Sequence, residues 1–344
     1  MNIFDLVSAK NIAQYWIEKN VNEQPLLGET LFPYQKEIGI QLDWIKGAKN
    51  QPIALRLSAY DVKSIRRDRK GFEKYTTEMP FFKESMYIDE KLRQELSRMI
   101  QTNNEELVNS ILTRLFDDQV QLIKASYVTM ERMRMEALTT GTITLASNGQ
   151  AYSYDYGIDA SQKKTVAKSW SDPSADIIGE ITNWMEEAKA NGITLTRAIV
   201  NSSVAKHFRT NTALKNAIYV FANGTVNITT ARALEYIYNE TGLSIYVYDN
   251  VYVNEEGKAV KYVPDDTMVM LPDGELGKTH VGVTPEESDL MNSLTAEVSL
   301  VDNYIAVTTH KEHDPVNVEM KVSMVGLPSF ERANEILIID TKNA

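Results

Sequence analysis

Histidine, cysteine and paired carboxylates are the side chains that most often carry chemistry, and this sequence has four histidines and no cysteine. Two of the histidines, His310 and His313, stand beside Glu312 and Asp314. A zinc site needs ligands that converge from one side and are oriented by further partners. In a β-strand, residues three apart point to opposite faces. The pattern therefore favours a solvated loop over a metal site, and we expect neither a metal nor a cofactor.

Adjacent carboxylates occur at several places and could supply an acid and a base. General acid–base catalysis needs one carboxylate to be desolvated and aimed at a substrate, and adjacency alone provides neither. We therefore expect solvated surface at these positions, and a turn at the pair that follows Pro264. The pairs considered as candidates are Asp117–Asp118, Glu186–Glu187, Asp265–Asp266 and Glu286–Glu287.

Short motifs of the common enzyme classes are missing from the sequence. It contains no Gly-x-Gly-x-x-Gly, no Walker phosphate loop, no Gly-x-Ser-x-Gly and no His-Glu-x-x-His. Because there is no cysteine, a thiolate nucleophile and a disulfide framework are excluded as well. We predict that the protein is not an enzyme.

Residues 56–74 are densely charged, with seven basic and three acidic side chains. The alternating residues around them predict a long two-stranded excursion over residues 53–88. Two interpretations stay open: a solvated loop, or a projecting hairpin that docks on an acidic neighbouring subunit. The candidate inter-subunit residues are Arg56, Lys63, Arg66, Arg67, Arg69, Lys70 and Lys74.

The formal net charge of −11 limits the partners that the chain can bind. Gripping duplex DNA requires a basic surface that neutralises phosphates, so net acidity argues against DNA binding but suits a protein that encloses DNA. No run of eighteen apolar residues occurs, and residues 1–19 lack the apolar core of a signal peptide. We expect a soluble protein made in the cytoplasm, without a membrane span.

One stretch, residues 81–140, contains neither glycine nor proline and predicts helix. Asp89 and Asn103 could each cap a helix, and apolar residues between Leu107 and Ala137 recur at spacings of three, four, seven or eight. A single helix over residues 104–139 would be about 54 Å long at 1.5 Å per residue. We interpret it as a spine packed against a sheet, because strict heptads are not maintained.

Elements of two further kinds surround this helix and together predict an α+β protein. Residues 295–340 predict strands. Together with the spine helix, these strands suggest one domain built from both ends of the chain. Residues 173–292 would form a smaller module inserted into that domain. A strand from Ile38 to Trp44 and a hairpin at 142–157, turning at Asn148–Gly149, precede the module. Within the module we predict helices from about 173 to 191, 204 to 218 and 229 to 241, strands at 198–200, 244–248 and 267–271, and a hairpin at 252–262.

Three stretches, in this order and spacing, resemble those of a known family. Leu31-Phe32-Pro33 precedes a charged hairpin that closes at Pro80-Phe81-Phe82 before the long helix. The strand Pro264-Asp265-Asp266-Thr267-Met268-Val269 is similar to a family strand that begins Leu-Pro-Asp-Asn-Thr-Met-Val. Leu327-Pro328-Ser329-Phe330 leads to a last strand, as in the family. On these residues the chain resembles, along essentially its whole length, the lambda-type major capsid protein E family of tailed bacteriophages.

The resemblance implies the fold shared by tailed-phage capsids, encapsulin shells and the floor of herpesvirus capsids. In that fold an N-terminal arm precedes an extended loop, a peripheral domain with a spine helix and a long sheet, and an axial domain. Carried over by position, the arm is 1–50, the loop 51–89, the peripheral domain 90–172 plus 294–344 with its spine at about 104–139, and the axial domain 173–293.

The function implied by the resemblance is structural. Copies of the chain would form pentamers and hexamers that close into an icosahedral head around double-stranded DNA in the virion, with assembly in the host cytoplasm. Expected partners are the chain itself, a separate scaffolding protein, a portal protein and packaged DNA bound without sequence specificity; a decoration protein stays open.

Three alternatives stay open beside this hypothesis. An encapsulin-like compartment would keep the fold and show an inward pocket for cargo peptides. An enzyme with scattered carboxylates would behave as a small oligomer instead of a particle. A receptor-binding virion protein would be rich in β-structure and lack the long helix.

Overall fold

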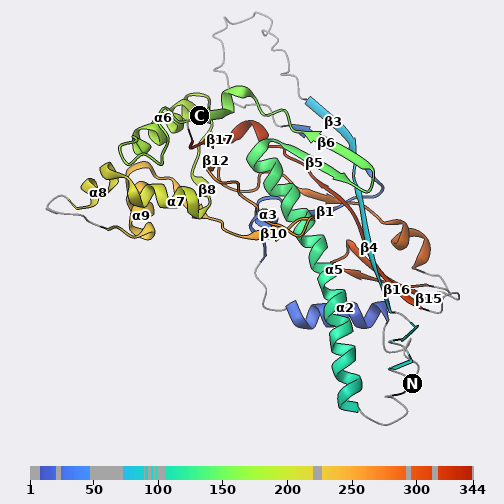
Figure 1. The fold of residues 1–344 in the computed structure, drawn as a ribbon. Coiled ribbons are helices and arrows are strands. Elements are labelled where there is room, and N and C mark those ends of the chain that lie inside the picture. The colour runs from blue at the N-terminus through green and yellow to red at the C-terminus, as the bar shows by residue number, and fades with distance from the viewer. Residues whose placement is uncertain are drawn as a thin grey trace, which may run out of the picture. The chain divides into compact units, whose positions relative to one another are not determined.

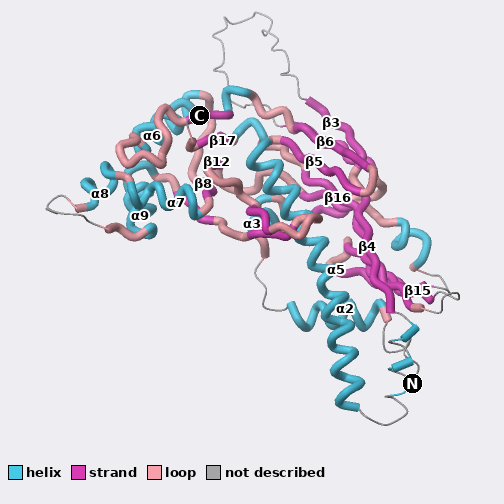
Figure 2. The backbone as a smooth tube through the Cα atoms, in the orientation of Figure 1, coloured by secondary structure: helices cyan, strands magenta, loops and turns pink. Residues whose placement is uncertain are grey.

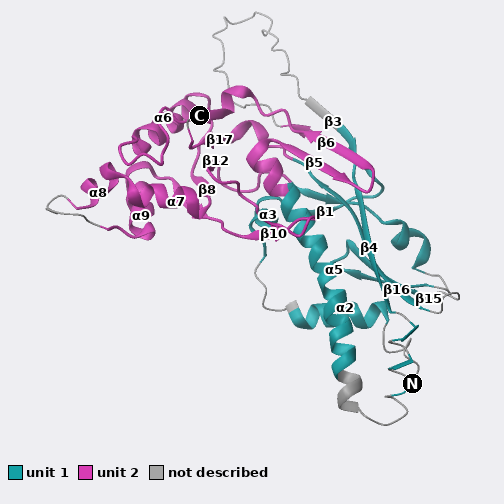
Figure 3. Ribbon diagram, in the orientation of Figure 1, with its two compact units in different colours: residues 1–42, 76–133, 278–329 teal, residues 43–75, 134–277, 330–344 magenta. Residues whose placement is uncertain are grey.

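The computed structural model shows a mixed α+β chain (Figures 1 and 2). It divides into two compact units, each assembled from three stretches of sequence (Figure 3). Unit 1 comprises residues 1–42, 76–133 and 278–329; unit 2 comprises 43–75, 134–277 and 330–344. The residues described are 8–20, 25–46, 73–88, 90–91, 94–95, 98, 105–219, 227–291, 296–311 and 317–342.

The longest element is helix α5, Glu105–Thr140, which has 36 residues and confirms the predicted single helix (Figure 1). At 1.5 Å per residue it is about 54 Å long. It ends at Gly141, whose φ of +83° is a left-handed conformation that glycine adopts without strain. Among the described residues, no helix is both long enough and apolar enough to cross a membrane.

Unit 1 contains a six-stranded sheet organised around the long strand β16. Strands follow the order β1-β13-β16-β15-β14, and β4 pairs with β16 as well. The β1–β13 pair is parallel and the others are antiparallel. The strands are β1 (Tyr34–Lys36), β4 (Phe81–Ile88), β13 (Thr279–Val281), β14 (Ala296–Val301), β15 (Ile305–Lys311) and β16 (Val318–Pro328); helices α2 (Ala9–Asn20) and α3 (Leu27–Leu31) and a π-helical turn, Glu286–Leu290, also belong to this unit.

Unit 2 contains a five-stranded sheet in the order β7-β17-β12-β8-β9. Apolar residues of this sheet and of its helices form one buried cluster, with Trp170, Phe208, Ile181 and Met268 all fully buried. The strands are β7 (Lys163–Thr165), β8 (Arg197–Val200), β9 (Ser244–Val247), β12 (Thr267–Leu271) and β17 (Leu337–Asp340); the helices are α6 (Ile177–Ala190), α7 (Ser202–Thr210), α8 (Thr212–Ile218) and α9 (Thr230–Thr241).

Each of these four helices begins at a residue whose side chain accepts a backbone N–H of the first turn. The caps are Asp176, Asn201, Asn211 and Thr229. Such caps satisfy N–H groups that have no partner inside a helix. The helices predicted at 204–218 and 229–241 are confirmed, the former broken at Asn211; α6 begins at its cap near 176 and not at 173.

Three two-stranded sheets complete the part of the fold that the structure describes. The hairpin of β5 (Thr142–Ser147) and β6 (Gln150–Asp155) confirms the prediction. Its turn residues Asn148 and Gly149 both have positive φ, as a tight two-residue turn requires. The other pairs are β10 (Val251–Val253) with β11 (Ala259–Lys261), and β2 (Gln41–Lys46) with β3 (Glu73–Glu78).

Two expectations about strands were wrong. The strand predicted from Ile38 begins only at Gln41, and Ile38 is 99% exposed because the chain bends through Gly39 before the strand starts. The last strand, β17, was predicted to belong with the other strands of residues 295–340, but it pairs with β12 of the central module. The sheet of the central module therefore includes the chain's final strand.

Candidate functional site

The basic residues predicted to contact a neighbouring subunit fall largely outside the described residues. Lys74 lies in β3, but only its backbone is described. The docking hypothesis for these residues therefore stays a prediction. Those outside the described residues are Arg56, Lys63, Arg66, Arg67, Arg69 and Lys70.

Of the two histidines considered as metal ligands, only His310 lies within the described residues. Its Nε2 lies 2.9 Å from Oε2 of Glu319, the residue directly opposite it on β16. His313 and its acidic neighbours lie outside the described residues. Within the described ranges, no group of three histidine, aspartate or glutamate side chains is arranged to hold a metal ion. His310 thus forms a cross-strand pair.

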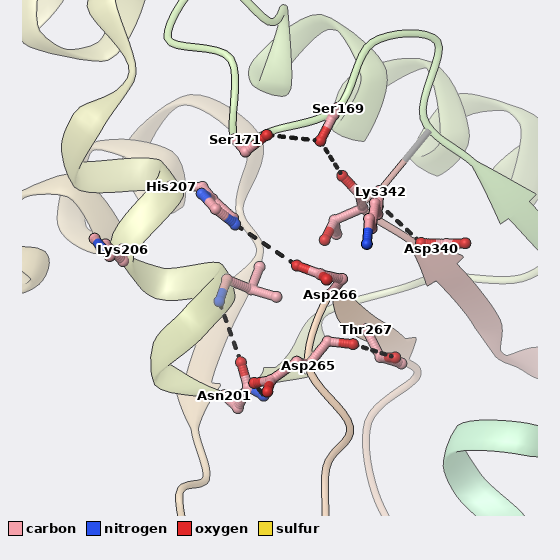
Figure 4. A network of polar contacts seen from close by, with 12 residues as sticks. Ser169, Ser171, Asn201, Lys206, His207, Asp265, Asp266, Thr267, Asp340 and Lys342 are labelled. Atoms are coloured by element: carbon pink, nitrogen blue, oxygen red, sulfur yellow. Dashed lines mark hydrogen bonds and ion pairs between the residues drawn. The ribbon is translucent and has the colours of Figure 1, made fainter. Parts of the chain in front are cut away.

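The turn that precedes β12 lies at the centre of a polar network in unit 2 (Figure 4). Asn201 caps α7 through its Oδ1, while its Nδ2 donates to Asp265 Oδ1 at 2.8 Å. Lys261 Nζ donates to the same carboxylate at 2.7 Å. The Lys261 ammonium, assisted by Asn201, holds the pKa of Asp265 below its usual range. A charged carboxylate thus links the start of a helix to the start of a strand.

Asp266, the next residue, has a φ of +60°, a left-handed conformation that aspartate tolerates better than most residues. Its carbonyl accepts the N–H of Thr341 at 2.8 Å, just after β17. His207 on α7 places Nε2 3.8 Å from its carboxylate (Figure 4). The turn predicted at this pair is confirmed. The network joins three elements and presents no nucleophile beside a base.

One arrangement in unit 1 has the geometry of a nucleophile–base–acid relay. His280 places Nε2 3.0 Å from Ser329 Oγ and Nδ1 2.9 Å from Glu37 Oε1. Yet Ser329 is fully buried, and its hydroxyl also bonds the backbone C=O of Lys278 at 3.1 Å. A serine nucleophile must reach a substrate carbonyl, and this one has no access to solvent. The three side chains therefore tie β1 and β13 to the end of β16.

An ion pair joins the π-helical turn to β16 of the same sheet. Lys321 Nζ lies 2.7 Å from Glu286 Oε1, and Ser323 Oγ donates to Oε2 at 2.8 Å. Burial alone would raise the pKa of Glu286, but these hydrogen bonds outweigh it and hold the pKa below 4.5. The solvated surface expected at Glu286–Glu287 was therefore wrong, since Glu286 is only 5% exposed. No local signal marked this pair, because Glu319, Lys321 and Ser323 alternate with apolar residues as the polar face of a strand does.

A hollow of about 360 Å³ lies beyond the C-terminal end of α6. Arg332 is the cationic side chain in its lining, and it already donates to Glu335 Oε2 at 2.8 Å and to the carbonyl of Asp273 at 2.6 Å. No free cation therefore faces the hollow from this position. Its lining residues are Asn191, Gly192, Ile193, Thr194, Thr196, Pro272, Asp273, Arg332 and Glu335.

Three solved structures resemble this chain in fold. A capsid protein assigned to an Escherichia coli prophage is 14% identical with a TM-score of 0.59, covering 97% of this chain and 99% of that one. A phage-related protein from Bordetella bronchiseptica is 11% identical with a TM-score of 0.55, covering 98% and 99%. The capsid of cyanophage A-1(L) is 12% identical with a TM-score of 0.51, covering 93% and 92%. The fold is thus that of phage capsid subunits.

Comparison with curated proteins gives no match for this sequence. The family described as Phage major capsid protein E matches residues 8–341, and the chain belongs to that family. It is a structural protein of the virion capsid and not an enzyme. The family predicted from the three sequence stretches is therefore confirmed.

Proposed function

We propose that copies of this capsid protein form pentamers and hexamers, which close into an icosahedral head around double-stranded DNA. The observation that carries the proposal is the family match over residues 8–341. The 36-residue helix α5 supports a structural role over a chemical one. The net charge of −11 suits a shell that encloses DNA without gripping it.

The proposal also assigns a structural role to each part of the chain. Residues 1–50 act as an arm and 51–89 as an extended loop. The peripheral domain is 90–172 with 294–344, and the axial domain, 173–293, converges at the centre of each capsomer. Each part gives neighbouring copies a separate contact, and many contacts of about 1 kcal/mol sum to a stable shell while allowing errors to be corrected.

Other proteins complete the proposed assembly. A separate scaffolding protein guides closure, and a portal protein occupies one vertex for DNA entry. A decoration protein on the finished shell would add a further partner. These partners are proposed because the chain belongs to the phage major capsid protein family.

The test is assembly of the overexpressed chain, with and without its scaffolding protein, viewed by negative-stain electron microscopy. Wild type should give closed shells. Replacing Arg66, Arg67 and Arg69 by glutamate should block assembly while circular dichroism still reports a folded chain, because the loop would now repel an acidic neighbour.

A matched variant with lysine at the same three positions keeps the charge and should assemble. Normal shells from the glutamate variant would refute the docking role of the loop. Small soluble oligomers of wild type under every condition, with the scaffolding protein present, would refute the proposed function itself.

A further inference from the structure

The β5–β6 hairpin of unit 2 carries an apolar face that runs from the protein interior into solvent. Its register places Ile143 opposite Tyr154 and Leu145 opposite Tyr152, so these four side chains share one face. Ile143 is fully buried, Leu145 and Tyr154 are half-buried, and Tyr152 is 44% exposed. The rings of Tyr152 and Tyr154 stack with centroids 6.3 Å apart. The apolar face therefore extends from buried residues to residues that the described part of the chain leaves exposed.

The two outer edges of this hairpin differ in their backbone groups. On β5, the N–H of Thr144 donates to Glu136 Oε1 at 3.0 Å, and the N–H of Thr142 donates to Thr140 Oγ1 at 3.1 Å. Side chains thus occupy that edge. The residues opposite on β6 also direct their backbone groups outward, and within the described residues β6 pairs with β5 alone. An edge without a neighbouring strand can add one.

The charge pattern indicates what covers this face. No charged residue occurs between Glu136 and Asp155, in a chain whose net charge is −11. Two identical acidic chains repel each other, and an uncharged contact surface reduces that cost. The cores of protein interfaces are depleted in charge and enriched in tyrosine, as this face is. By contrast, the tip of the β10–β11 hairpin carries Glu256 and Lys258 as an exposed ion pair.

We propose that the tip of the β5–β6 hairpin, through Leu145, Tyr152 and Tyr154, docks on a second copy of this chain. This inference rests on the proposed function, since it names one of the contacts by which the copies assemble. A two-stranded hairpin is marginally stable in water, and this one gains its remaining cover from the neighbouring copy. The open edge of β6 lies beside the same contact and can accept a strand of that copy.

The test compares two variants that place the same charge on opposite faces of the hairpin. In Tyr152→Asp the carboxylate enters the proposed contact, and the concentration needed for half-maximal assembly should rise at least about tenfold, because an unpaired charge is costly to bury. In Ala146→Asp the carboxylate lies on the other face, one residue from Leu145, and assembly should match wild type. Sedimentation velocity measures assembly, and circular dichroism checks the fold.

A second measurement keeps the proposal testable if Tyr152→Asp fails to fold. A photo-reactive benzoylphenylalanine at position 152 replaces one aromatic ring by another and should cross-link copies into a dimer band, whereas the same group at position 146 should not. Equal assembly of wild type and Tyr152→Asp, or equal cross-linking from both positions, would overturn the hairpin contact alone. Absence of any assembly by wild type would overturn the proposed function with it.

Discussion

The two sheets of the molecule bury polar groups by different means. Around the sheet of unit 2, neutral amides such as Asn201 and Asn211 are fully buried and bond backbone groups at the starts of helices. At the sheet of unit 1, the buried polar groups are paired with charged partners: Glu286 with Lys321, and His280 with Glu37. Amides need no counter-charge, whereas a buried charge requires a partner that arrives from elsewhere in the chain.

Both units join distant segments through polar side chains, but unit 2 does so with neutral amides and unit 1 with charged groups. Asn201 and Asn211 of unit 2 each accept an N–H three residues away and donate to a carbonyl 62 and 36 residues away, respectively, and the helices then pack a continuous apolar cluster. In unit 1, the ion pair joins residues 35 positions apart and the histidine bridge joins residues 243 apart. We therefore expect apolar packing to dominate the stability of unit 2, and charge pairing to contribute more in unit 1.

The largest expected effect is at the apolar cluster. Phe208→Ala removes a fully buried ring whose centroid lies 5.6 Å from that of Trp170, and should lower the free energy of unfolding by about 3–5 kcal/mol. Urea denaturation of the unassembled chain measures it. Tyr238→Ala on α9 is the control, because Tyr238 is 54% exposed and should change stability little. A loss of below about 1 kcal/mol at Phe208 would contradict the apolar account of unit 2.

The ion pair of unit 1 should give the next largest effect. Lys321→Met leaves the Glu286 carboxylate buried without its counter-charge and should cost about 2–3 kcal/mol, somewhat below the range for a fully buried pair. The reduction is expected because the Lys321 side chain keeps 22% exposure.

Replacing both partners by methionine completes a double-mutant cycle. The double variant should regain most of the stability that Lys321→Met loses, because no uncompensated charge is left in the sheet. Equal losses in the single and double variants, measured by urea denaturation, would show that the pair acts by packing and not by charge. The contrast between the two sheets would then disappear.

The range of each contact along the chain explains what the sequence could predict. The helix at 104–139 and the hairpin at Asn148–Gly149 follow from local rules of periodicity, capping and turn chemistry. The pairing of β17 with β12 and the burial of Glu286 depend on which distant segments meet, and no local pattern encodes that. The capsid family was predicted from the order of three stretches, while the burial of Glu286 and Ser329 became clear only from the fold.

Two caps within unit 2 separate the effect of burial from the effect of capping. Asn201 and Thr229 each accept a backbone N–H at a helix start, but Asn201 is fully buried and Thr229 is exposed. Thr229→Ala should cost about 1 kcal/mol, the usual loss for a cap. Asn201→Ala should cost about 2 kcal/mol, because buried carbonyl groups also lose a donor. Equal losses in thermal or urea unfolding would mean that the Asp265 network adds nothing to the cap.

Acidification should give the smallest effect and still distinguish the two units. The folded state holds the pKa of Glu286 below 4.5, so the unfolded chain binds more protons near that pH. Its contribution to stability is therefore complete above pH 4.5 and is lost as the pH falls through the folded value. Glu286→Gln should reduce the loss of unfolding free energy between pH 7 and pH 3.

Asp265 in unit 2 has a lowered pKa for a similar reason, the ammonium of Lys261, but it is exposed. Because solvent screens an exposed pair, Asp265→Asn should reduce the acid sensitivity less than Glu286→Gln does. Urea titrations of wild type and both variants at the two pH values decide the order. The reverse order would mean that the stability of this capsid subunit depends on pH more through the exposed turn before β12 than through the buried carboxylate of Glu286.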